Sequence, residues 1–133
     1  MEVLNIGKEK LFETLGKLFY AVAACDGHIH ELEALQLKQL LKFKWMSLSE
    51  DEGVSEDASV RIENEFEHLV DQNADHKQCF EAFNTYFDTH QEQFSKALTH
   101  LIFNTAYGIA NAFEGINADE KILLKKLAEK LLA

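Results

Sequence analysis

Apolar residues recur every three or four positions along most of the chain, which is the spacing of one face of an α-helix. In the first such segment, about 8–25, they are Leu11, Leu15, Leu18, Phe19, Val22 and Cys25. The same spacing predicts further helices at about 31–46, 58–72, 91–113 and 118–132. In the last of these, the apolar positions are Ile122, Leu124, Leu127 and Leu131. No alternating strand pattern of useful length occurs. The sequence therefore predicts an all-α fold, a compact bundle of about six helices.

A sixth helix is predicted between 58–72 and 91–113. Asp75 followed by Gln78 has the spacing of a capping box, which marks a helix start. The positions after it form a strongly aromatic face, made by Cys79, Phe80, Phe83, Tyr86 and Phe87. Residues 47–57 are polar and acidic, with the turn residues of a connector. The absence of proline agrees with long uninterrupted helices.

The two ends of the chain are related by an internal repeat. A shift of 87 positions aligns Tyr20 with Tyr107, Ala23 with Ala110, Ile29 with Ile116, Glu33 with Glu120 and Leu37 with Leu124. Each copy consists of a helix end, a turn containing glycine, an isoleucine and a second helix. We therefore expect two pseudo-twofold-related helical hairpins, at about 8–46 and 93–133, with 47–92 inserted between them.

Composition and charge fit one domain spanning residues 1–133. The net charge is −10, and the segment 47–92 contains two basic and thirteen acidic residues, a net charge of −11. The two repeat halves are therefore close to neutral. Nucleic-acid binding needs clustered Lys and Arg, so we expect no nucleic-acid partner. The acidic segment favours another protein with a basic surface, although such a patch more often only keeps a protein soluble.

The expected location is the cytoplasm. Two cysteines cannot make a disulfide framework, which fits a reducing compartment. No segment approaches the roughly 20 apolar residues of a membrane-spanning helix, so we expect no membrane insertion. The string from Val22 to Cys25 is similar to a lipoprotein cleavage site, but its apolar run is short and its flank contains Glu9 and Glu13.

The most specific string in the chain runs from Asp26 through Gly27, His28, Ile29 and His30 to Glu33. A calcium-binding EF-hand would also need oxygen ligands at positions 22 and 24, which are valine and alanine, so this motif is excluded. A purely structural interpretation is that Gly27 closes one helix while Glu33 caps the next. The second copy, from Asn117 to Glu120, has the same capping pattern.

The string from Tyr20 to Glu33, followed by an apolar helix and a weaker copy near the C-terminus, resembles the TerB-like family. That family includes tellurite-resistance TerB proteins and the N-terminal domain of a DnaJ-like co-chaperone. The resemblance implies an all-α, pseudo-twofold domain whose paired acidic motifs bind a divalent metal. It also implies a bacterial stress-response role and no catalytic activity.

By position, Asp26 and Glu33 match the acidic pair of the family, and Glu120 matches in the second copy. Phe113 replaces the second aspartate, so Glu114 or Asp119 is the remaining candidate there. These oxygen ligands favour weak binding of calcium or magnesium. His28 and His30 would add nitrogen ligands suited to zinc, nickel or iron, although turn histidines are more often solvated. No organic cofactor is expected.

Templates for enzyme sites do not fit the sequence. A di-iron bundle needs two Glu-x-x-His pairs, and Glu65 with His68 is the only one. No nucleophile elbow, phosphate-binding glycine loop or zinc-protease motif occurs. We therefore expect a non-enzymatic stress-response module that binds a divalent metal at the turn from Asp26 to Glu33. The alternative is a metal-free interaction module that uses the acidic segment 47–92.

Overall fold

A computed structural model describes residues 2–27, 29–45, 56–112 and 115–132. Within these ranges the chain is helical and contains no strand, so the all-α prediction is confirmed. The α-helices are α1 (Glu2–Ala24), α2 (Glu31–Leu40), α4 (Glu56–Gln72), α5 (His76–Thr89), α6 (Lys96–Ala110) and α7 (Ala118–Leu131). A π-helical turn, η1 (Leu41–Trp45), extends α2, and a 3₁₀ turn, η2 (Gln91–Gln93), precedes α6. The predicted connector at 47–57 lies almost entirely outside the described residues. None of the described helices is both long and apolar enough to cross a membrane.

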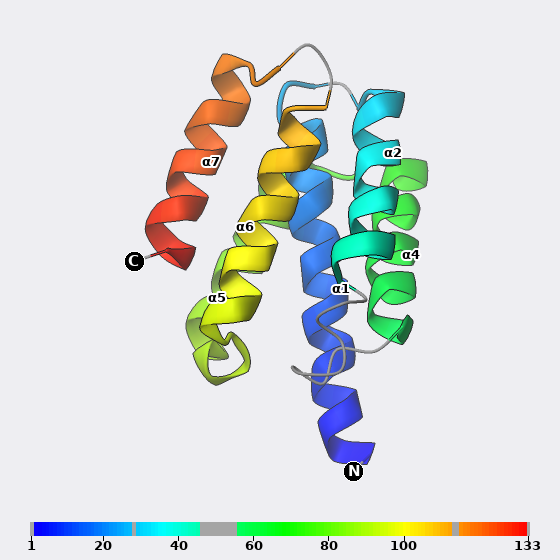
Figure 1. Cartoon of the computed structure of the whole chain (residues 1–133), viewed down its shortest axis with the longest axis vertical. Coiled ribbons are helices and arrows are strands. Elements are labelled where there is room, and N and C mark those ends of the chain that lie inside the picture. Colours follow the sequence, from blue (N-terminus) through cyan, green and yellow to red (C-terminus); the bar gives the residue numbers. More distant parts are fainter. Residues whose placement is uncertain (1, 28, 46–55, 113–114, 133) are drawn as a thin grey trace.

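Helix α1 forms the centre of the bundle (Figure 1). It packs against α4, α5 and α6, while α2 and α7 both pack on α6. Every residue of its last two turns, 18–24, is buried, so the apolar stripe predicted there widens to the whole helix circumference. The hairpins α1–α2 and α6–α7 lie side by side, with α4 and α5 covering α1.

Two sequence predictions about the C-terminal half were wrong in detail. The helix expected at 91–113 begins at Lys96, because the Ser95 hydroxyl caps it by accepting a hydrogen bond from the Leu98 amide at 3.1 Å. Phe94 has an extended backbone conformation, and its ring centroid lies 4.7 Å from that of Phe87, which belongs to the predicted aromatic face. Ile122, which the periodicity placed on the buried face of α7, is exposed, and Leu123 is buried instead.

The contact between α1 and α4 depends on Gly16. A Cβ atom at this position would lie 2.7 Å from Cβ of Glu65 and 2.9 Å from the carbonyl oxygen of Ile62. Both atoms belong to the rigid part of α4, so any side chain at position 16 would push the two helices apart. The glycine therefore allows α1 and α4 to pack closely at this position.

We expect Gly16→Ala to lower the free energy of unfolding by roughly 1–3 kcal/mol, because overpacking outweighs the better helix propensity of alanine. Gly108→Ala is the matched control. The one tight contact of a Cβ there would be with the methyl end of the flexible Leu40 side chain, at 2.8 Å, while Gln36 Nε2 lies at an ordinary 3.7 Å, so that variant should be neutral or slightly stabilised. Urea denaturation followed by circular dichroism measures both. Equal effects of the two substitutions would contradict the assignment of Gly16 to a tight helix contact.

Candidate functional site

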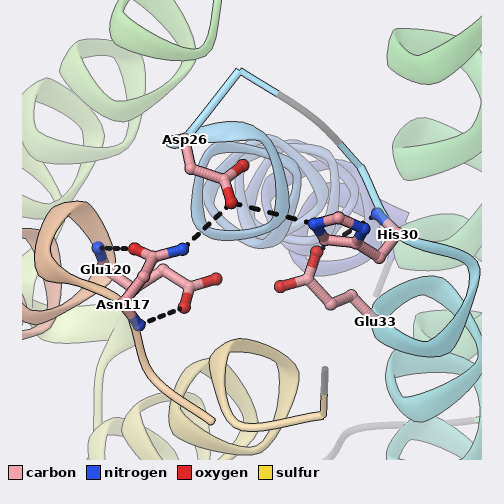
Figure 2. A network of polar contacts seen from close by, with 5 residues as sticks. All are labelled: Asp26, His30, Glu33, Asn117 and Glu120. Atoms are coloured by element: carbon pink, nitrogen blue, oxygen red, sulfur yellow. Dashed lines mark hydrogen bonds and ion pairs between the residues drawn. The ribbon is translucent and has the colours of Figure 1, made fainter. Parts of the chain in front are cut away.

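The candidate site lies where the two hairpins meet, at the N-termini of α2 and α7 (Figure 2). Gly27, with φ of 93°, follows α1, and Gly115, with φ of 80°, follows α6. In each hairpin the next helix begins after an N-cap residue in an extended conformation, His30 before α2 and Asn117 before α7. The sequence repeat therefore corresponds to a repeat of local structure.

Both repeated glutamates cap the helix that contains them. Oε1 of Glu33 accepts a hydrogen bond from the backbone N–H of His30 at 3.3 Å, and Oε1 of Glu120 accepts one from the backbone N–H of Asn117 at 3.0 Å. The Asn117 side chain completes the second capping box by accepting from the Glu120 amide at 2.8 Å. The predicted capping role is confirmed for both glutamates, and it uses one carboxylate oxygen of each.

Asp26 connects the two hairpins. Its Oδ2 atom accepts a hydrogen bond from Nδ2 of Asn117 at 2.9 Å and lies 3.9 Å from Nε2 of His30. One aspartate thus contacts the N-cap residues of both helices. The repeat supplies no second aspartate, since the aligned position is Phe113, which lies outside the described residues.

The remaining carboxylate oxygens of the two glutamates meet between the hairpins. Glu33 and Glu120 are each 1% exposed, and their carboxyl groups point toward one another (Figure 2). No hydrogen-bond donor of the described residues reaches Oε2 of Glu120. Two carboxylates that face each other and are buried away from solvent cannot both stay charged, so one of them must hold a proton.

This proton belongs mainly to Glu33. Burial, together with the neighbouring carboxyl group of Glu120, raises the pKa of Glu33 from 4.5 to about 8. The hydrogen bond from the His30 backbone acts in the opposite direction and does not offset the burial. At neutral pH and in the absence of a cation, the Glu33 carboxyl group is therefore mostly protonated.

The structure brings together four of the five residues predicted for a metal site: Asp26, His30, Glu33 and Glu120. His28, the fifth, and Glu114 lie outside the described residues. Asp119 is exposed and makes none of the contacts described for this site. Asn117 was missed as a site residue. The repeat contained the necessary signal, because the shift of 87 positions aligns Asn117 with His30.

The side-chain donor atoms at this site are mainly carboxylate oxygens. No group of three or more His, Cys, Asp or Glu side chains in the described part of the chain has the geometry of a metal cage. Burial and the nearby carboxylates, Glu120 first, raise the pKa of the neighbouring Cys25 to about 12, so its thiol stays protonated. Paired carboxylates suit calcium or magnesium, which complete their coordination shells with water.

In comparisons with known proteins, no family model, curated sequence or solved structure matches this chain significantly.

Proposed function

We propose that this protein is a non-enzymatic, TerB-like stress-response module in which Glu33 and Glu120 bind a divalent cation weakly between the two hairpins. The observation that carries the proposal is the pair of buried carboxyl groups, one of which has an oxygen without a hydrogen-bond donor from the described residues. Such a pair needs either a proton or a cation to remain buried.

A cation would replace the shared proton. Each glutamate keeps one oxygen on a backbone N–H, so the two facing oxygens would be the protein ligands. Two carboxylates with several waters make a site typical of weakly bound calcium or magnesium. Asp26, held by Asn117 and His30, would add negative charge at the edge of the site without itself needing to ligate.

The structural consequence would be a cross-link between the sequence-distant α2 and α7. These helices pack on α6 but contribute residues from opposite ends of the chain. A cation held between their first turns would stabilise the folded state by mass action, because the unfolded chain has no such pair of ligands.

The test is calorimetric titration of calcium, magnesium and zinc into the cation-free protein at pH 7. We expect calcium or magnesium to bind with a dissociation constant on the order of 0.1–1 mM. Binding should release close to one proton for each cation, measured from the dependence of the heat on the ionisation enthalpy of the buffer.

Glu33→Gln and Glu120→Gln should each abolish binding, because either variant leaves a single carboxylate. Glu129→Gln, at an exposed position on α7, is the matched control and should bind as the unmodified protein does. Absence of binding by any of the three cations, or binding unchanged in both site variants, would overturn the proposal.

The stress-response part of the proposal rests on the resemblance to TerB-like proteins and is tested separately. Genes for tellurite resistance or chaperones beside the gene for this protein would support it. The alternative function, a metal-free interaction module using the acidic segment 47–92, stays a prediction. If this alternative holds, adding or removing divalent cations should not change the binding of a partner protein.

A further inference from the structure

A groove with an apolar floor and an acidic rim runs between α2 and α4. Its volume is about 430 Å³, which lies within the range of ligand-binding clefts. The floor contains the buried side chains of Leu37 and Phe66. Leu32 and Leu35 border it and are 51% and 50% exposed, although both are large apolar residues. Two half-exposed leucines over a continuous apolar floor are typical of a surface that another molecule covers.

The charges around this groove are unequal. Glu31, Glu63 and Glu67 contribute three carboxylates, and Lys38 contributes one ammonium group, which lies 3.4 Å from Glu63. The groove therefore has a net negative charge before a partner binds. It also borders α4, which belongs to the segment with a net charge of −11. A partner must present positive charge on either side of its apolar contacts to match this surface.

The backbone around the groove determines the shape of that partner. Both walls are α-helices, whose N–H and C=O groups are used within the helix, so no sheet edge is offered to an extended peptide. A partner segment must satisfy its own backbone hydrogen bonds, as a helix does. The ten residues of α2 span about 15 Å, which accommodates two to three turns of a docked helix.

We infer that the α2–α4 groove binds an amphipathic helix of a partner protein, with apolar residues on one face and Lys or Arg on both flanks. Leucine-sized side chains of that helix contact Leu32, Leu35 and Phe66, while its basic flanks meet Glu31, Glu63 and Glu67. The docking uses neither Glu33 nor Glu120, so it is independent of the proposed cation site.

The test uses a synthetic helical peptide of about 14 residues, with leucines at positions i, i+3, i+4 and i+7 and lysines on both flanks. Fluorescence anisotropy of the labelled peptide should show saturable binding in the range of about 10–100 μM, typical of a transient helix contact. Two peptide controls are a version with glutamate in place of each lysine and a version of the same composition with the leucines scattered around the helix. Neither should bind.

Variants of the protein locate the binding surface. The double variant Leu32→Ser/Leu35→Ser should lose at least about tenfold in affinity, since two apolar contacts are removed. Ile122→Ser/Leu132→Ser removes two comparably exposed apolar residues, at 57% and 42%, that do not line the groove, and should leave peptide binding unchanged. Glu31→Gln/Glu67→Gln should weaken binding by about five- to tenfold at low salt and less at high salt.

Three results would overturn the inference: no saturable binding up to about 1 mM peptide, equal binding of the glutamate or scattered peptide, or full binding by Leu32→Ser/Leu35→Ser. Light scattering tests whether a second copy of the chain occupies the groove instead. Concentration-dependent self-association that this double variant abolishes would assign the groove to a second copy of the chain and exclude a partner helix. Far-UV circular dichroism shows whether the same variant is folded, which keeps this test separate from that of the carboxyl pair.

Discussion

In cation-free buffer, the free energy of unfolding should fall as the pH rises from about 5 to 8, and Glu33→Gln should remove most of that fall. The pKa of Glu33 is about 8 in the folded protein, against 4.5 ordinarily. Between these values the folded state binds more protons than the unfolded state, so raising the pH favours unfolding. The contribution of Glu33 to the free energy of unfolding is fully present below about pH 4.5. It declines between pH 4.5 and 8 and is lost above about pH 8.

The expected loss is about 1.4 kcal/mol for each pKa unit that separates the folded and unfolded states, a total of a few kcal/mol. Urea denaturation at a series of pH values measures it. In Glu33→Gln the amide group can donate to Glu120 at every pH and can still cap α2, so this variant should be more stable than the unmodified protein at pH 8. Millimolar calcium or magnesium should raise the free energy of unfolding of the unmodified protein at pH 8 and leave that of the variant unchanged.

Other titrating groups contribute to the pH profile, so the comparison is between variants. Glu129→Gln, exposed on α7, should keep the pH profile of the unmodified protein. If Glu33→Gln retained the same decline between pH 5 and 8, the carboxyl pair would not be the source of it. That result would also contradict the expectation that cation binding releases a proton.

The second large effect is expected for Trp45→Ala, which should lower the free energy of unfolding by about 3–5 kcal/mol. Trp45 is fully buried at the end of η1, and its ring lies edge-on to Phe19 at 6.1 Å. Its indole N–H donates to Oγ1 of Thr105 at 3.0 Å, which joins the first hairpin to α6. Truncation therefore leaves a large cavity and removes the donor of a buried hydrogen bond.

Phe43→Ala is the matched control, because Phe43 is in the same turn and 66% exposed. Its cost should stay within about 0.5 kcal/mol. Far-UV circular dichroism must follow the unfolding of both variants, since Trp45 is the only tryptophan of the chain and its fluorescence is absent from Trp45→Ala. Similar costs for the two substitutions would show that η1 does not direct Trp45 into the core as described.

These two aromatic residues illustrate how far sequence patterns reach. The periodicity predicted a helix through residue 46, and the chain is indeed helical through Trp45. Trp45 lies four residues after Leu41 and eight after Leu37, both of which are buried, so helical spacing alone favours Trp45 over Phe43 as the buried aromatic residue. What the spacing does not reveal is that this last turn is π-helical.

The candidate site was predictable in its local part. The turn glycine, the N-cap position and the glutamate three residues later are separated by only a few residues, so the capping structure follows from short-range hydrogen bonding. The duplication further indicated that Glu33 and Glu120 have the same role. Asn117 as a partner of Asp26 was not expected, since the contact joins residues 91 positions apart.

The sequence by itself determined the helices and the caps, because each depends on residues within one or two turns of one another. It also determined the two related hairpins, because the repeat at a shift of 87 positions is visible in the residues themselves. Only the tertiary structure decided that the two capping glutamates face each other away from water. That arrangement follows from the packing of α2 and α7 against α6, and it converts two ordinary helix caps into a carboxyl pair that must hold a proton or a cation. The same packing exposes Leu32 and Leu35 above an acidic groove.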